Sequence, residues 1–284
     1  MTALLEVAGL VKEFSVRGEG GRRTKFRAVD DVSFEVAAGE VLGLVGESGS
    51  GKSTTARCIM RILDPTSGSV RFDGKDLLKV NGRKLRAARR GMQMVFQDPY
   101  SALDPRMKVG DIIAEGMIIH GLRTGPGERT ARVEELLQLV GLRPDHMARR
   151  PANFSGGERQ RIGIARALAM DPQLLICDEP VASLDVSIQA QILNLFSDLQ
   201  RELGLAIVYI AHDLATVRHL CDRVAVMQDG RIQEIGPREQ IYNHPTSAYT
   251  KELIAAVPIP DPVKQRERQR GAGRVPSEPE VTPS

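Results

Sequence analysis

Short apolar runs recur along the chain and alternate with amphipathic stretches. Seven of them predict strands, at residues 32–36, 41–46, 69–74, 93–96, 174–180, 205–212 and 223–230. Several runs are apolar at every position, which is the pattern of strands that are buried on both faces. Residues 52–63 and 187–203 carry apolar side chains at helical spacing between such runs. The alternation predicts an α/β fold with a largely parallel core sheet.

The pattern changes between Asp98 and Met170. Three helical stretches, 109–122, 128–142 and 156–170, follow one another there with no clear strand between them. We interpret residues 98–170, approximately, as a helical subdomain that is inserted into the α/β core. Six of the 16 prolines lie after Val257, among mixed charges and almost no large apolar residues. This composition predicts a disordered tail over 259–284.

The amino-acid composition is that of an ordinary globular protein and argues against several other classes of protein. Of the 284 residues, 42% are hydrophobic and 26% charged, as in ordinary globular proteins. A net charge of +3, only 4% aromatic residues and no Trp argue against a nucleic-acid-binding surface. Cys58, Cys177 and Cys221 are far apart and form no CxxC pair, so they predict neither a zinc site nor a disulfide framework. The N-terminus lacks the pattern of a signal peptide, and the apolar stretch 205–211 is too short to span a bilayer.

Residues 46–54, GESGSGKST, match the pattern G-x-x-x-x-G-K-[ST] between a predicted strand and a predicted helix. Glycines at these positions let backbone amides wrap phosphate groups. Lys52 would place its charge on the β- and γ-phosphates, and the Ser53 hydroxyl is suited to Mg²⁺. The expected nucleotide-binding residues of this loop are Gly46, Ser48, Gly49, Ser50, Gly51, Lys52, Ser53 and Thr54.

Polar residues also stand at the ends of three other predicted strands. Asp178 and Glu179 end LLICDEP, where Asp178 would hold Mg²⁺ and Glu179 would orient the attacking water. His212 follows the strand at 205–212 and is placed to hydrogen-bond a γ-phosphate, although a lone histidine is often structural. Gln97 lies just beyond the strand at 93–96, within reach of water or Mg²⁺.

A further anion site is predicted in NFSGGERQRIGIARAL, residues 153–168. Ser155 followed by Glu158 is the capping-box pattern of a helix start. Gly156 and Gly157 lower helix propensity, so their presence indicates unusual backbone angles or the close approach of another molecule. The bare amides of such a helix start favour an anion.

Taken in order, GESGSGKST, Gln97, FSGGERQR, LLICDEP, SLD and His212 resemble the ATP-binding subunit of an ABC transporter over roughly residues 4–257. The resemblance implies a P-loop NTPase (RecA-like) core, an N-terminal antiparallel β subdomain, and an ATPase domain over residues 1–235. It implies ATP and Mg²⁺ as ligands, with Mg²⁺ held by Ser53, Gln97 and Asp178. Glu179 becomes the catalytic base and His212 the catalytic switch residue.

The same resemblance assigns Ser155, Gly156 and Gly157 to a signature that binds the γ-phosphate of ATP on the opposite subunit. Ser183, Leu184 and Asp185 correspond to the D-loop, which reaches the partner site. An aromatic side chain stacks on adenine in this family, and Phe14 matches best, with Phe26 as the alternative. The signature departs from the usual pattern at two positions, Phe154 for Leu and Glu158 for Gln. Glu158 would repel a phosphate unless it turns back to the Ser155 amide.

The stretches VFQDPYSALDPRM and NHPTSAYTKELIAAVP resemble the oligopeptide/dipeptide importer branch, which includes nickel importers. That branch carries a C-terminal extension, here 236–258, in which His244, Pro245, Tyr249 and Thr250 match its H-P-Y-T motif around an insertion. Some members bind an iron–sulfur cluster near the C-terminus. No cysteine follows Cys221, so we expect no iron–sulfur cluster here.

The resemblance implies a peripheral protein at the cytoplasmic face of the cell membrane. Its implied partners are two membrane-spanning permease subunits, a second ATPase subunit and, indirectly, an extracytoplasmic substrate-binding protein. The second ATPase is a further copy of this chain or, as we favour, a paralogue. No nucleic acid is expected. The alternative is a soluble ABC ATPase that acts on ribosomes or nucleic acid.

Overall fold

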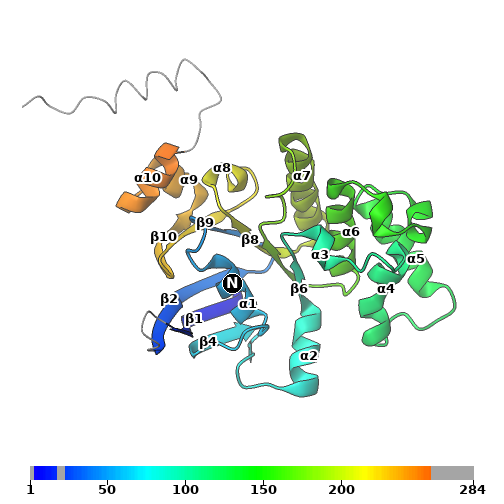
Figure 1. Cartoon of the computed structure of the whole chain (residues 1–284), viewed down its shortest axis with the longest axis horizontal. Coiled ribbons are helices and arrows are strands. Elements are labelled where there is room, and N and C mark those ends of the chain that lie inside the picture. The colour runs from blue at the N-terminus through cyan, green and yellow to red at the C-terminus, as the bar shows by residue number, and fades with distance from the viewer. Residues whose placement is uncertain (1–2, 18–22, 257–284) are drawn as a thin grey trace, which may run out of the picture.

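A six-stranded central sheet organises the molecule (Figure 1), in the order β10-β9-β3-β8-β7-β6. The computed structural model describes residues 3–17 and 23–256. Strands β9, β3, β8, β7 and β6 run parallel, and β10 pairs antiparallel with β9. The strands are β3 (Val41–Val45), β6 (Met92–Val95), β7 (Leu174–Asp178), β8 (Ala206–Ala211), β9 (Arg223–Gln228) and β10 (Arg231–Pro237). The predicted α/β fold with a largely parallel core sheet is confirmed.

Both faces of the central sheet are covered, which explains its uninterrupted apolar runs. In β3, Leu42 and Leu44 belong to the core on one face, and Val41 and Val45 to the core on the other. The first core lies against the N-terminal sheet and α1 (Lys52–Ile59), and the second against the helices. The central strands thus deliver the residues that follow them to one edge of a rigid sheet.

The N-terminal part forms a second, antiparallel sheet in the order β2-β1-β4-β5. Its strands are β1 (Ala3–Arg17), β2 (Arg23–Ala37), β4 (Ser67–Phe72) and β5 (Lys75–Asp76). The antiparallel β subdomain implied by the resemblance is confirmed. The apolar run at 32–36 is only the end of a much longer strand, because the rest of β2 is exposed at most positions and lacks a continuous apolar signal.

Helices dominate between β6 and β7 and lie at one side of the central sheet (Figure 1). They are α3 (Pro99–Ala102), α4 (Val109–Ile119), α5 (Glu128–Leu139), the short 3₁₀ helices η1 (Pro144–Ala148) and η2 (Pro151–Asn153), and α6 (Gly156–Leu168). The three predicted helices are present and each ends two or three residues early. Gly121 and Gly141, both in the left-handed region, lie in the turns that follow α4 and α5. The domain boundaries proposed from the sequence remain predictions.

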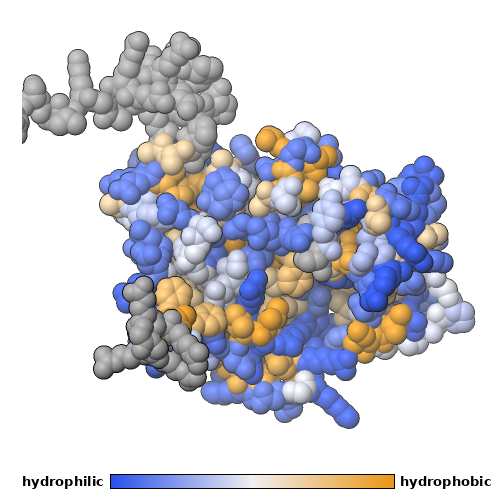
Figure 2. Space-filling view, viewed as in Figure 1, coloured by the Kyte–Doolittle hydropathy of each residue, from blue (hydrophilic) through white to orange (hydrophobic). Residues whose placement is uncertain are grey.

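The remaining helices are α2 (Gly82–Gly91), α7 (Val186–Leu203), α8 (Leu214–Val217), α9 (Arg238–Asn243) and α10 (Ala248–Ala256). The tail at 259–284 lies outside the described residues. Within the described ranges, no helix combines the length and apolar character needed to cross a bilayer. On the face shown in Figure 2, hydrophobic residues form separate small groups among hydrophilic ones.

Candidate functional site: the phosphate loop and the strand ends around it

The loop between β3 and α1 is pressed against neighbouring backbone. A Cβ on Gly46 would lie 2.0 Å from the Met227 carbonyl oxygen, and one on Gly51 would lie 2.2 Å from that of Ala28. The two glycines have φ angles of 154° and 101°, and Gly49 has 85°. Any side chain at Gly46 or Gly51 would therefore clash with main chain in a conformation that already favours glycine. These backbone conformations explain the glycines, and phosphate binding by the loop stays a prediction.

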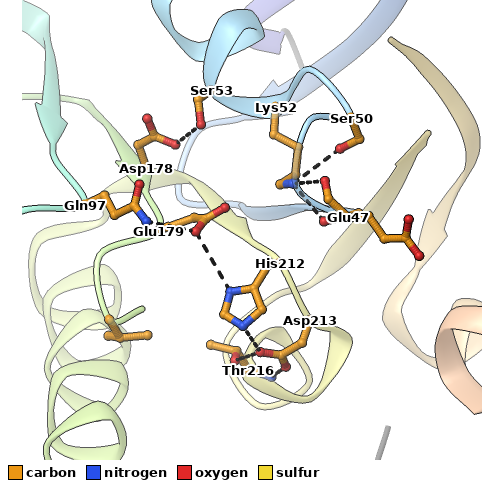
Figure 3. A network of polar contacts seen from close by, with 12 residues as sticks. Glu47, Ser50, Lys52, Ser53, Gln97, Asp178, Glu179, His212, Asp213 and Thr216 are labelled. Carbon is orange, nitrogen blue, oxygen red and sulfur yellow. Dashed lines mark hydrogen bonds and ion pairs between the residues drawn. The ribbon is translucent and has the colours of Figure 1, made fainter. Parts of the chain in front are cut away.

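Lys52 lies inside the curve of this loop (Figure 3), where only 3% of the residue is exposed. Its ammonium donates hydrogen bonds to the Gly46 carbonyl at 2.7 Å, the Glu47 carbonyl at 2.8 Å and the Ser50 hydroxyl at 3.3 Å. Burial lowers the pKa of Lys52, and the nearby carboxylates of Glu179 and Asp178 oppose that shift. An anion placed in the loop would restore the preference for the charged form. Ser48 is exposed on the same loop.

Side chains with oxygen atoms that could bind a metal ion come together from α1, β7 and the end of β6, near Lys52. The Ser53 hydroxyl on α1 donates to the Asp178 carboxylate at the end of β7, at 2.7 Å. Asp178 is 4% exposed. Gln97, which follows β6, donates from its amide nitrogen to Glu179 at 3.3 Å. Ser53 and Gln97 thus each contact one of two adjacent acidic side chains, Asp178 and Glu179 (Figure 3). Such oxygen donors suit Mg²⁺.

Glu179 occupies a backbone conformation that side chains rarely adopt, with φ at 45°. Its amide donates to the Ile210 carbonyl of β8 at 3.1 Å, which fixes the turn after β7. The side chain faces His212, whose Nδ1 lies 3.9 Å from Glu179 Oε2. The two residues predicted to be catalytic are therefore close enough to act on one bound group.

Asp213 is a site residue that sequence reasoning missed. Its carboxylate lies 3.4 Å from Nε2 of His212 and accepts hydrogen bonds from the amide and the hydroxyl of Thr216, each at 2.8 Å. Asp213 is thus the N-cap of α8 and also borders the imidazole. The Asp-x-x-Thr spacing was the available signal, since it is typical of a helix start.

The start of α6 confirms the predicted capping box. Ser155 accepts from the Glu158 amide at 3.3 Å, and Glu158 Oε2 accepts from the Ser155 amide at 2.9 Å. The hydrogen bond from the Ser155 backbone is the main reason why the pKa of Glu158 lies below its ordinary value. Glu158 therefore turns back toward Ser155, as the capping box predicts.

Packing within this chain helps to explain the glycines at positions 156 and 157. A Cβ on Gly157 would lie 2.5 Å from Ile188 Cγ2 on α7, and one on Gly156 would lie 3.3 Å from Leu184. Asp185 caps α7 by accepting from the Ile188 amide at 3.0 Å. The close approach of α7 thus excludes a side chain at Gly157, whereas one at Gly156 would require only a small movement of Leu184.

Ser155, Gly156 and Gly157 line a pocket of about 530 Å³ that is separate from the phosphate loop. Its other lining residues are Gln97, Asp98, Tyr100, Ser183, Leu184, Asp185 and Ile188. None of the residues 46–54 lines it. Gln97, which also bonds Glu179, is therefore the one lining residue that this pocket shares with the side chains described around the phosphate loop.

The two adenine candidates lie next to each other in the N-terminal sheet. Phe14 on β1 and Phe26 on β2 are cross-strand partners. Phe26 is 53% exposed, and the Lys12 ammonium lies 5.2 Å from the centre of the Phe14 ring. Adenine stacking by Phe14 stays a prediction.

Comparisons with known proteins agree with this geometry. Residues 29–182 match the ABC transporter family, and residues 233–283 match the family described as oligopeptide/dipeptide transporter, C-terminal region. The oligopeptide transport ATP-binding protein OppF of Bacillus subtilis is 51% identical over 271 residues, which are 94% of this chain and 86% of OppF. The dipeptide transport ATP-binding protein DppF of Lactococcus lactis is 48% identical over 260 residues, 91% of this chain and 83% of DppF.

Among solved structures, a dimeric ATP-binding cassette in a post-hydrolysis state with ADP and Pi superposes with a TM-score of 0.73. It is 28% identical in sequence, and the match covers 82% of this chain and 98% of that one. The family match spans residues 29–182, a range that includes the phosphate loop, Asp178 and Glu179. The chain therefore belongs to the ABC transporter family, as one of its ATP-binding and ATP-hydrolysing subunits.

Proposed function

We propose that this chain hydrolyses ATP to energise an ABC importer for oligopeptides, dipeptides or a related small substrate. The observation that carries the proposal is the convergence of Lys52, Ser53, Asp178, Glu179 and His212 at one edge of the sheet. The names of the OppF and DppF relatives, together with the match of residues 233–283, support the peptide class.

Each side chain has a distinct part in the proposed reaction. Lys52 leaves the loop carbonyls and binds the β- and γ-phosphates, while the loop amides hold the remaining phosphate oxygens. Glu179 accepts a hydrogen bond from the attacking water, orients it toward the γ-phosphate and takes its proton. His212, beside Glu179, donates to the γ-phosphate and responds to its loss.

The residues present fit Mg²⁺. Ser53 donates a hydrogen bond to Asp178 at 2.7 Å, and Gln97 donates to Glu179, the neighbour of Asp178, so oxygen-bearing side chains of the kind that Mg²⁺ prefers lie close together. We assign Ser53, Asp178 and Gln97 to the metal. When bound, Mg²⁺ would neutralise charge that develops on the phosphates.

The proposed partners follow from the separation of the two anion sites. A second ATPase subunit, a paralogue or a second copy, would place its own signature over this chain's phosphate loop. Pairing and separation of the two ATPase subunits would change the conformation of two permease subunits. Binding to these permease subunits would hold the protein at the cytoplasmic face of the membrane. The substrate-binding protein would act on the permease from the other side.

Co-expression with candidate permease subunits tests this function. After solubilisation, we expect the chain to purify with the permease and to hydrolyse ATP faster when peptide-loaded binding protein is added. The same complex with Lys52→Ala should assemble but show no stimulated hydrolysis. Sedimentation with ribosomes, and no association with the permease, would favour the soluble ABC ATPase instead.

A further inference from the structure

The C-terminal extension reaches back to the nucleotide site. Its helices α9 and α10 lie next to α8 at the same end of the molecule (Figure 1). The hydroxyl oxygen of Tyr249, on α10, accepts a hydrogen bond from the backbone amide of Glu47 at 3.3 Å. Glu47 directly follows Gly46 in the phosphate loop. A residue of the extension thus contacts the main chain of the loop that is assigned to the ATP phosphates.

The peptide group on each side of Glu47 is held by a different part of the chain. Tyr249 accepts from the Glu47 amide, and the Lys52 ammonium donates to the Glu47 carbonyl at 2.8 Å. When Lys52 turns to a phosphate, its hold on the carbonyl ends. The hydrogen bond that Tyr249 accepts from the Glu47 amide does not depend on where Lys52 points, so it can keep Glu47 in place while phosphates bind.

Glu234 fixes the start of the helix that carries Tyr249. This residue of β10 is 8% exposed, and its carboxylate accepts from the Thr246 amide at 2.9 Å, the Thr246 hydroxyl at 2.8 Å and the Ser247 amide at 3.1 Å. Burial acts to raise the pKa of Glu234, but the hydrogen bonds it accepts, led by the Thr246 amide, bring it below its ordinary value. A charged carboxylate therefore anchors the segment just before α10 to the central sheet.

A pocket of about 570 Å³ is lined both by residues of α10 and by residues near His212. Glu47, His212 and Asp213 line one side of it, and Tyr249, Glu252 and Leu253 line the other. The pocket leaves room between the extension and the switch histidine, while Tyr249 provides the hydrogen bond that joins the extension to the phosphate loop.

We propose that Tyr249 is a positioning residue for the phosphate loop, and that the C-terminal extension sets the affinity for nucleotide phosphates through it. The inference rests on the proposed function insofar as residues 46–54 are taken to bind ATP. Tyr249 contacts no phosphate in this account; it holds the Glu47 amide so that the amides that follow face the bound nucleotide. A loop held in its binding conformation binds more tightly, because less order is lost on binding.

Tyr249→Phe tests the proposal, since it removes one oxygen and keeps the ring that packs against the core. Loss of one such hydrogen bond should raise the Kd for Mg-ATP about fivefold in the purified full chain. Hydrogen exchange at the Glu47 amide should become faster in the same variant. Tyr242→Phe is the matched control: its hydroxyl, also on the extension, donates to the Leu214 carbonyl rather than to the loop. Its Kd should stay close to that of the wild type even if Tm falls.

An unchanged Kd in folded Tyr249→Phe would overturn the proposal, and so would an equal rise in Tyr242→Phe, because the effect would then reflect general docking of the extension. Glu234→Gln provides a second variant that leaves Tyr249 intact but loosens the start of α10. It should raise the Kd in the same direction, and no rise would contradict the role given to the extension. Failure of the wild-type chain to bind ATP would instead refute the proposed function, so the two failures are distinguishable.

Discussion

Glu179 combines a left-handed backbone conformation with a side chain that contacts Gln97 and His212. A left-handed conformation costs a non-glycine residue roughly 1–2 kcal/mol. Here it is retained because the amide bonds to Ile210 and the side chain meets Gln97 and His212. A chain that continued β7 without this turn would direct the carboxylate elsewhere. Strain of this kind at a strand end is typical of residues whose position matters for function.

Glu179→Gln should leave ATP binding close to that of the wild type and lower the hydrolysis rate by about a hundredfold or more, because the amide cannot accept the proton of the attacking water. The rate of phosphate release and the Kd for Mg-ATP are the two measurements. Glu239→Gln, at an exposed position on α9, is the matched control and should change neither. Retained hydrolysis in Glu179→Gln would refute the assignment of the base.

Several site residues could be predicted because their contacts follow from simple geometry. Parallel strands bring their carboxyl ends to one edge, so Asp178, Glu179 and His212 had to lie near the loop after β3. Asp213, Tyr249 and Glu234 were not predicted as functional, because their partners are set by how distant segments pack. Nothing in the sequence pairs Tyr249 with Glu47, 202 residues away.

At the scale of elements, the starts of α6 and α7 are packed too closely for side chains between them. A Cβ on Gly157 would clash with Ile188 of α7, and one on Gly156 would lie 3.3 Å from Leu184, just before α7. The two helices therefore present their N-terminal amides from one compact unit. The sequence showed the glycines and the cap, but not the neighbour that makes the glycines necessary.

Gly157→Ala should destabilise the fold by about 1–3 kcal/mol, because the β-branched Ile188 cannot easily move its Cγ2 away from the new methyl group. Gly163→Ala is a control in the same helix, where a Cβ would meet no atom within 4 Å. That change should instead stabilise the helix by up to about 1 kcal/mol. Denaturant unfolding measures both, and the same sign for the two variants would contradict the packing described.

Glu158→Gln should be tolerated at pH 7, because glutamine also completes a capping box. The lowered pKa of Glu158 means that its contribution to stability is present above the ordinary glutamate value of about 4.3 and is lost as the pH falls through the folded-state pKa. The stability of wild type relative to Glu158→Gln should therefore decrease in acid. If the stability advantage of the wild type grew as the pH fell, Glu158 would not be held by Ser155. A large gain in ATP-dependent dimerisation of Glu158→Gln at pH 7 would also contradict the orientation of Glu158 toward Ser155.

Elements with weak or exposed patterns were the ones that the sequence did not predict. Helix α2 buries none of its side chains, so it has no apolar stripe to detect. Strand β1 is interrupted by shifts in register with β2, which break its alternation. Strand β10 lies at the edge of the central sheet, where fewer of its side chains need to be apolar. Buried central strands, by contrast, were identified close to their observed bounds.

Over the entire chain, we propose that two incomplete anion sites are present. The phosphate loop and its acids lie at one edge of the central sheet, and Ser155–Gly157 open into a separate pocket lined by the D-loop. In this proposal a solitary chain would offer a γ-phosphate only one set of donors and would leave it open to water. Pairing two ATPase subunits head to tail would complete both sites, and hydrolysis would separate them.

The most direct test of this account measures ATP hydrolysis by dimers in which the same two defects are arranged differently. Lys52→Ala disables a phosphate loop, and Gly156→Asp places a negative charge in a signature. In one arrangement both changes are on this chain and its partner ATPase, a paralogue or a second copy, is wild type. In the other, Lys52→Ala is on this chain and the signature change is on the partner. Tags on both subunits isolate the mixed dimers.

If each site is built from both subunits, the first arrangement damages both sites, while the second confines both defects to one site and leaves the other whole. We therefore expect hydrolysis from the second arrangement and almost none from the first, with equal dimer content and equal Tm as controls. Equal hydrolysis by the two arrangements would contradict the account, because it would mean that the phosphate loop and the signature do not belong to shared sites.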